Sequence, residues 1–181
     1  MVYLFLADGF EEIEALTQVD YLRRAGIEIK TLGIGKEYIT GTRRITVKAD
    51  MLIDDADPTG FEMLILPGGL GGVEGISSSE KALEMIKYAF DSKKKVSAIC
   101  AAPTILAKMG LLKGKKCICY PSMTDDLREN GATVVDEAVV CDGLLITAKG
   151  AGASEQFSFE IIASLKGRAA AEKVRESICA R

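Results

Sequence analysis

A cysteine flanked by small residues stands in the segment Ala98-Ile99-Cys100-Ala101-Ala102-Pro103. The residues two before and two after Cys100 are alanines, as a nucleophile on a tight strand-to-helix turn requires. Such a turn places the side chain above the sheet, at the N-terminus of a helix. Free amides and the helix dipole stabilise an anion there, so we expect the pKa of Cys100 to lie below its ordinary value. The alternative is a buried structural cysteine in a small-residue contact.

Three glutamates, Glu11, Glu12 and Glu14, open the first segment of helical period. Carboxylates in a first turn usually complement the helix dipole on a solvated face, which is the interpretation for Glu11 and Glu12. Glu14 stands between apolar residues and can turn inward above the sheet. A charged carboxylate would repel a thiolate, so Glu14 assists Cys100 only if burial keeps it protonated as a hydrogen-bond donor.

The glycine-rich segment Pro67-Gly68-Gly69-Leu70-Gly71-Gly72 follows an apolar run. Glycines allow backbone amides to turn inward and bind an anion. The segment lacks the Gly-Lys-Ser/Thr of a phosphate-binding loop, and Glu74 occupies the place of the third glycine of a dinucleotide motif. An oxyanion hole and a plain turn are the two interpretations.

Histidine is absent from all 181 residues. This absence excludes Ser-His-Asp hydrolysis, Cys-His proteolysis and any histidine-ligated metal centre, and we expect no metal or cofactor. Lys and Arg number 23 and Asp and Glu 26, so the net charge is −3. A mildly acidic chain offers no general attraction for nucleic acid or an anionic membrane.

Five cysteines, Cys100, Cys117, Cys119, Cys141 and Cys179, occur without a signal-peptide pattern or an apolar run of membrane-spanning length. An odd number in this context predicts free thiols and a cytoplasmic location. The Cys-x-Cys pair formed by Cys117 and Cys119 is interpreted as two buried apolar side chains, since no further metal ligand is near in sequence.

Apolar runs alternate with segments of helical period along the whole chain, so we expect one domain, residues 1–181. The pattern is typical of an α/β three-layer sandwich, with a mostly parallel sheet and helices on both faces. Ligands bind at the carboxyl ends of the strands in such folds, so the loops that follow the strands should meet there. Strands are predicted at 2–7, 28–33, 63–66, 96–99, 117–119, 138–141 and 144–147, edge strands or a hairpin at 45–47 and 51–53, and helices at 11–25, 79–92, 101–109, 154–165 and 169–178.

Three motifs in this order resemble the ThiJ/PfpI superfamily, in particular the branch of the parkinsonism-associated deglycase and its bacterial relatives. The likeness covers nearly the whole chain, and its motifs are Asp8-Gly9-Phe10-Glu11-Glu12-Ile13-Glu14, Leu66-Pro67-Gly68-Gly69 and the segment around Cys100. It implies a flavodoxin-like sandwich that assembles as a homodimer, with Cys100 as the reactive cysteine and Glu14 as its protonated partner. By the same resemblance, the amides of Gly69 and Ala101 would hold an oxyanion, and Arg43 would lie near the site at the dimer interface.

Two positions depart from the superfamily pattern. Many relatives carry a histidine where this chain has Tyr120, which disfavours a Cys-His protease and makes Tyr120 a candidate substrate contact. The Gly-Pro-Gly-Thr loop of the relatives is Gly150-Ala151-Gly152-Ala153 here, without the proline and the hydroxyl. The loss of the proline and the hydroxyl from this loop is expected to alter which small molecule fits the site.

Two functions follow from these residues. As an enzyme, the Cys100 thiolate attacks the aldehyde of a 2-oxoaldehyde such as methylglyoxal, and Glu14 moves protons while the adduct becomes a 2-hydroxy acid. The same chemistry would release early glycation adducts. As a redox sensor or oxidative-stress chaperone, Cys100 is oxidised and Glu14 holds the product. Both functions need an accessible thiol that ionises readily.

Overall fold

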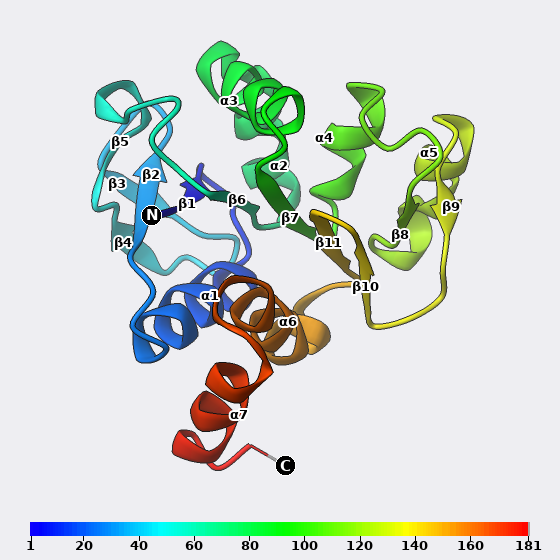
Figure 1. Cartoon of the computed structure of the whole chain (residues 1–181). Coiled ribbons are helices and arrows are strands. Elements are labelled where there is room, and N and C mark those ends of the chain that lie inside the picture. The colour runs from blue at the N-terminus through cyan, green and yellow to red at the C-terminus, as the bar shows by residue number, and fades with distance from the viewer. Residues whose placement is uncertain (181) are drawn as a thin grey trace.

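A seven-stranded sheet forms the centre of the computed structural model, which describes residues 1–180 (Figure 1). The strand order is β10-β11-β7-β6-β1-β2-β5, and all neighbours are parallel except the hairpin β10–β11. The strands are β1 Val2–Leu6, β2 Ile29–Gly33, β5 Met51–Leu52, β6 Met63–Leu66, β7 Lys95–Ile99, β10 Val139–Asp142 and β11 Leu145–Ala148.

Helices cover both faces of this sheet, so the predicted three-layer α/β sandwich is confirmed (Figure 1). Two apolar cores result, because alternate side chains of a strand point to opposite faces. Val2 and Leu4 of β1 face one core, and Tyr3 and Phe5 face the other. The first core lies under α1 Glu12–Arg24 and α6 Ser154–Lys166, and the second lies under α2 Leu70–Ser78, α3 Glu80–Asp91 and α4 Pro103–Lys108.

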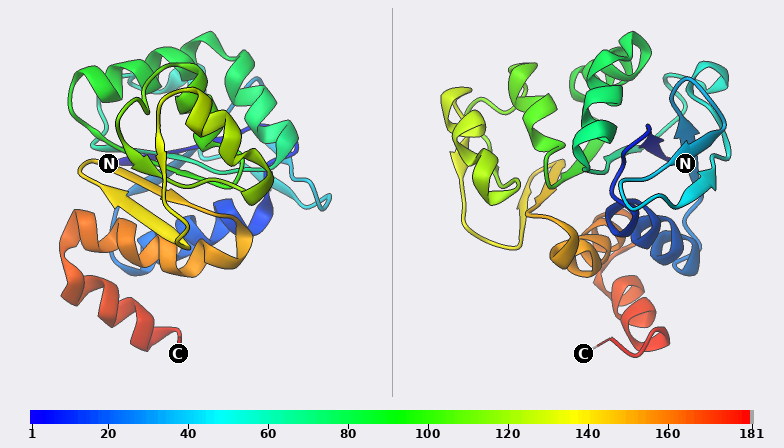
Figure 2. Two further views of the ribbon diagram at one scale, coloured as in Figure 1. Left: turned by 90° about the vertical axis from the view of Figure 1, so that its right-hand side faces the viewer. Right: turned by 180° about the vertical axis from the view of Figure 1, so that it is seen from behind.

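The remaining elements lie at the margins. Figure 2 shows α7 Arg168–Ser177 on the outer side of α6, away from the sheet. The hairpin of β3 Tyr38–Thr40 and β4 Thr46–Lys48 is antiparallel, as expected for 45–47, whereas β5 adds to the main sheet parallel to β2. The short parallel pair of β8 Lys116–Cys117 and β9 Thr133–Val134 lies beside α5 Thr124–Glu129. Among the described residues, no helix is long and apolar enough to cross a membrane.

Helix α2 is the main element that the sequence pattern misses. Three glycines within it lower its intrinsic helix propensity, so the segment looks like an extended turn. The structure requires all three. A Cβ on Gly71 would lie 2.9 Å from the Asp8 carbonyl oxygen, one on Gly72 would lie 2.8 Å from the Phe10 Cα, and one on Gly75 would lie 2.5 Å from the Ala7 Cβ. These glycines let α2 pack directly against the loop that follows β1.

Candidate active site

Cys100 stands at the carboxyl end of β7, where the chain turns toward α4. Its φ is +62°, in the left-handed region that residues with a Cβ rarely adopt. The turn is fixed on both sides, since the Cys100 amide donates to Ala148 O at 2.9 Å and its carbonyl accepts from the Tyr120 amide at 2.8 Å. Ala98 and Ala102 are fully buried around it. This is the nucleophile-elbow geometry that the small-residue pattern predicts, and the elbow delays the start of α4 to Pro103.

Glu14 reaches this elbow from the first turn of α1. Only 1% of Glu14 is exposed, and its Oε2 accepts from the Gly68 amide at 2.9 Å. The carboxyl is also hydrogen-bonded to the Cys100 thiol and to the Ala151 amide. Burial raises the pKa of Glu14 to about 7. The pKa of Glu14 is therefore shifted upward, as burial was expected to shift it. Glu14 retains a proton in a substantial fraction of molecules near neutral pH.

The Cys100 sulfur faces the amides of Ala101 and Gly69, which are hydrogen-bonded to it. Its pKa is nevertheless raised to about 12, first by burial and then by the charge of Glu14. The expected lowering of the thiol pKa is thus wrong, because burial disfavours the thiolate and the negative charge of an ionised Glu14 repels it. A thiolate at neutral pH requires that Glu14 keep its proton, so the two groups titrate as a pair.

Gly68 and Gly69 shape the wall of this site. A Cβ on Gly68 would lie 2.4 Å from Glu14 Oε2 and 2.6 Å from Cys100 Cβ. Gly69 has a φ of +85°, and a Cβ there would lie 2.3 Å from the Gly9 carbonyl oxygen. Only glycine at both positions lets one backbone turn contact the carboxyl and the thiol together.

A cavity of about 480 Å³, the Cys100 pocket, opens over these groups. All six residues predicted for the site line it: Cys100, Glu14, Gly69, Ala101, Arg43 and Tyr120. Arg43 and Tyr120 are exposed on its rim. The other lining residues were not among the predicted site residues, although Ser122 and Met123 fall in a loop expected at this edge. They are Glu11, Thr42, Leu70, Ser122, Met123 and Ala151.

Comparisons with known proteins identify the family of the chain. A family model described as the DJ-1/PfpI family matches residues 1–164. The chain is 34% identical over 167 residues to deglycase PfpI of Pyrococcus furiosus, covering 92% of this chain and 100% of that protein. The crystal structure of Drosophila melanogaster DJ-1beta is similar with a TM-score of 0.95 and 34% identity, covering 99% of this chain and 97% of that chain.

The chain belongs to the DJ-1/PfpI family. The resemblance predicted from the three motifs is therefore confirmed. Some relatives are longer: the chain spans 37% of the length of protein DJ-1 homolog B of Arabidopsis thaliana, to which it is 38% identical over 165 residues, or 90% of this chain.

Glu12 has a different environment in this DJ-1/PfpI chain from the one expected. It is 4% exposed rather than solvated, and its Oε1 accepts from the amides of Arg43 at 2.7 Å and Ile45 at 3.4 Å. A Cβ on Gly41 would lie 2.4 Å from the Glu12 carboxyl. Glu12 thus anchors the loop that holds Arg43 on the rim of the Cys100 pocket. Glu11 does cap α1 as expected, accepting from the Glu14 amide at 2.9 Å.

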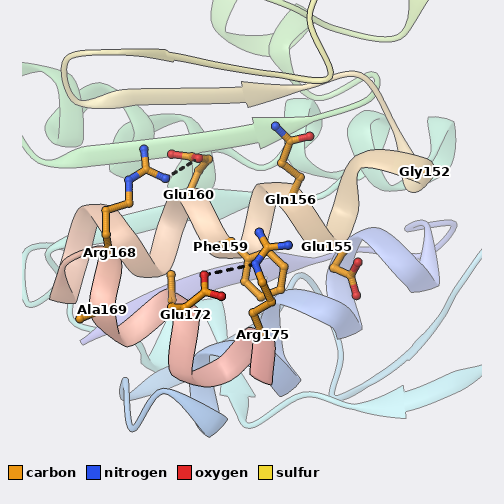
Figure 3. A pocket seen from close by; sticks show the side chains of 10 residues that line it. Gly152, Glu155, Gln156, Phe159, Glu160, Arg168, Ala169, Glu172 and Arg175 are labelled. Carbon is orange, nitrogen blue, oxygen red and sulfur yellow. Dashed lines mark hydrogen bonds and ion pairs between the residues drawn. The ribbon is translucent and has the colours of Figure 1, made fainter. Parts of the chain in front are cut away.

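A larger cavity of about 740 Å³ lies between α6 and α7, and we call it the α6–α7 groove (Figure 3). Its charges are paired, since Arg168 contacts Glu160 at 2.7 Å and Arg175 contacts Glu172 at 3.5 Å. The Arg175 guanidinium also lies 4.2 Å from the centre of the Phe159 ring. The lining of the α6–α7 groove contains no cysteine, serine or threonine, whereas the smaller Cys100 pocket contains a thiol beside a buried carboxyl.

The other four cysteines lie outside the pocket, and all five are free thiols. Cys117 and Cys119 are buried in the second core, as predicted. Cys141 and Cys179 are exposed. Residues 1–180 contain no group of three or more acidic or cysteine side chains that could hold a metal ion.

Alkylation should distinguish these thiols. We expect iodoacetamide at neutral pH to modify Cys100 fastest, because the amides of Gly69 and Ala101 stabilise its anion when Glu14 is protonated. The Cys141 sulfur has the carboxyl of Glu160 beside it in place of backbone amides, and Cys117 and Cys119 are buried in the folded chain. Mass-mapped labelling over a pH series tests this order. Equal labelling of Cys100 and Cys117, or a Cys100 midpoint at an ordinary thiol pKa of about 8.5, would contradict it.

The raised pKa of Glu14 also predicts a pH dependence of stability. The folded chain holds the Glu14 proton to a pKa of about 7, whereas an exposed carboxyl loses it at 4.5. The folded state binds more protons in this window, so the free energy of unfolding falls as pH rises through it, by about 3 kcal/mol. Urea unfolding at pH 5 and pH 8 measures this decrease in the free energy of unfolding. The decrease should be smaller by about that amount in Glu14→Gln, which has no carboxyl to titrate. Equal losses in the two proteins would show that Glu14 does not titrate there.

Proposed function

We propose that this chain is a cofactor-free enzyme that converts 2-oxoaldehydes such as methylglyoxal into 2-hydroxy acids through Cys100. The observation that carries the proposal is the convergence of a thiol, a buried carboxyl and two backbone amides in one pocket. A relative named as a deglycase supports an enzymatic role. Without a histidine, the chain has no Cys-His pair for proteolysis.

The first step is attack on the aldehyde. The Cys100 sulfur forms a bond to the aldehyde carbon, and the carbonyl electron pair moves to the oxygen. The amides of Gly69 and Ala101 stabilise that oxyanion, which becomes a hydroxyl on taking a proton from Glu14. The product is a hemithioacetal, and Glu14 is left as the carboxylate that the next step needs.

The second step moves a hydrogen between neighbouring carbons. The Glu14 carboxylate removes the C1 proton, and electrons shift to the C2 carbonyl oxygen through an enediol. The proton returns to C2, and the C1 hydroxyl proton passes to the C2 oxygen as the C1 carbonyl forms, which gives a 2-hydroxy thioester on Cys100. Water then cleaves the thioester, releasing the 2-hydroxy acid and the free thiol, so that the net reaction adds one water to the 2-oxoaldehyde. The same attack on an early glycation adduct would release the amine, which is the deglycase variant of this proposal.

The proposal is tested by incubating the purified chain with methylglyoxal in the presence of a chelator. We expect consumption of methylglyoxal and formation of lactate in equal amounts, without added cofactor. In deuterated water, deuterium should enter at C2, because the Glu14 proton exchanges with solvent before it is returned. No lactate above the buffer control would contradict the proposal.

A redox role is the second candidate, and the amides at the sulfur favour it. An oxygen added to Cys100 would accept hydrogen bonds from Gly69 and Ala101, and from Glu14 while it is protonated. Titration with peroxide, followed by mass spectrometry, should then give a stable sulfinic acid at Cys100 alone. Either function requires a free thiol, so a reducing, cytoplasmic location is part of both proposals.

Assembly as a homodimer is a further part of the proposal. Ile13 is 54% exposed and Ile45 is 51% exposed, and both flank Glu12, which anchors the Arg43 loop. Exposed isoleucines on this side form an apolar surface that a second copy would cover. We expect sedimentation at micromolar concentration to give twice the 19.4 kDa chain mass, and Ile13→Lys to shift it toward monomer. A wild-type monomer would remove the case for Arg43 at an interface.

A further inference from the structure

Gln18 is a fully buried amide on α1, four residues after Glu14 and therefore on the same face of the helix. Its Nε2 donates to the Ser154 carbonyl at 3.2 Å, and its Oε1 accepts from Ser158 Oγ at 2.8 Å. Ser154 and Ser158 are buried as well, within the apolar contact between α1 and α6. A buried amide is costly unless it is hydrogen-bonded, so this polar contact holds the two helices in one register.

The contact also fixes a wall of the Cys100 pocket. Ser154 is the first residue of α6 and follows directly on the short 3₁₀ turn Ala151–Ala153. The Ala151 amide is hydrogen-bonded to the Glu14 carboxyl. A Cβ built on Gly150 would lie 3.8 Å from Glu14 Oε1 and 3.9 Å from Cys100 Sγ. Gln18 thus ties the end of this turn to the helix that carries Glu14.

We propose that Gln18 is a positioning residue of the Cys100 pocket, which keeps the turn Ala151–Ala153 closed over the Glu14 carboxyl. Gln18 lies outside the pocket lining and acts only through the turn. The inference deepens the proposed function and rests on it for any effect on turnover. Its effect on the thiol follows from the Cys100–Glu14 contact alone.

The effect of losing the Gln18–Ser154 contact follows from the reason why the pKa of Glu14 is raised. Burial is the largest cause of its raised pKa. If the turn moves away, the carboxyl loses both its burial, which raises its pKa, and the Ala151 amide, which lowers it. Burial is the larger of the two causes, so the pKa of Glu14 falls toward the ordinary value. Glu14 is then ionised at neutral pH, and its charge suppresses the Cys100 thiolate.

Gln18→Met tests the proposal, because methionine has a similar length and fills a buried apolar contact. The Ser154 carbonyl keeps its hydrogen bond from Ser158 Oγ at 3.0 Å, so the substitution leaves neither of these two groups on α6 without a partner. The readout is the pH profile of Cys100 alkylation by iodoacetamide, which requires no aldehyde turnover. The profile of the coupled pair has a lower step that follows the loss of the Glu14 proton. We expect this lower step to move down by roughly half a pH unit or more, and the rate at pH 7.5 to fall several-fold because ionised Glu14 suppresses the thiolate.

Ser158→Ala is the matched control. It removes a hydrogen bond from the same buried contact but leaves the Gln18–Ser154 bond in place. We expect lower stability in this variant with an unchanged alkylation profile. An unchanged profile in folded Gln18→Met, or the same shift in Ser158→Ala, would overturn the positioning role. Because alkylation reports on the thiol alone, absence of lactate formation would count against the proposed function and not against this inference.

Discussion

Cys100→Ser should lower the turnover of methylglyoxal by a factor of roughly 10⁴ or more, to the level of the buffer control. Serine keeps the left-handed turn and the small volume, so the fold and the pocket are retained. A hydroxyl is a far weaker acid than a thiol, and Glu14, with a pKa of about 7, cannot ionise it. The expected result is therefore a folded protein without activity.

Cys141→Ser is the control for this experiment. Cys141 is exposed on β10 and lies outside the Cys100 pocket, so its replacement should leave turnover unchanged. Lactate formation is followed for both variants at several substrate concentrations, with circular dichroism as the check of folding. Turnover that survives in Cys100→Ser would mean that another group carries out the reaction. Turnover that is lost only in Cys141→Ser would lead to the same conclusion.

Glu14→Gln should lower turnover by a factor of ~10²–10⁴, because an amide cannot transfer the proton that both steps require. The amide oxygen can still accept from Gly68, and the amide nitrogen can donate to the sulfur. No charge then stands beside Cys100, so one of the causes that raise the pKa of the thiol is removed. The two measured rates should therefore change in opposite directions. Alkylation of Cys100 becomes faster than in the wild type, while turnover of methylglyoxal becomes slower.

Glu14→Asp separates reach from proton transfer. It keeps an acid but shortens the side chain by one methylene, which weakens the contacts with Gly68 and the sulfur. We expect partial turnover and slower alkylation. Stopped-flow alkylation and steady-state turnover are measured on the same preparations of both variants. Full turnover in Glu14→Gln would mean that Glu14 only holds the sulfur in place, which favours the redox role.

Local patterns predicted most of the fold. The apolar runs that became β1, β6 and β7 are buried on both faces, and a period of two distributes their side chains between the two cores. Ser79 caps α3, and Gly26 follows α1 with a φ of +65°; serine and glycine are residue types that favour these two positions. These features depend on neighbours within a few residues, so the sequence displays them directly.

The features that the sequence did not predict depend on contacts between distant segments. Helix α2 depends on its close approach to the loop after β1, which outweighs the poor helix propensity of its glycines. Glu12 is buried by a loop more than 30 residues away, and its position in the first turn of a helix does not report that contact. Propensity and periodicity describe a segment by itself, and both cases were decided by packing between segments.

The sequence by itself determined the elbow at Cys100, the candidate partner Glu14 and, by the absence of histidine, the exclusion of Cys-His chemistry. These conclusions rest on residue type and on local sterics. Only the tertiary structure decided the protonation of the pair, because Glu14 meets Gly68 across 54 residues and the Gln18 contact with Ser154 spans 136. Burial and charge repulsion act through space, so the pKa values of Cys100 and Glu14 follow from which distant segments cover them.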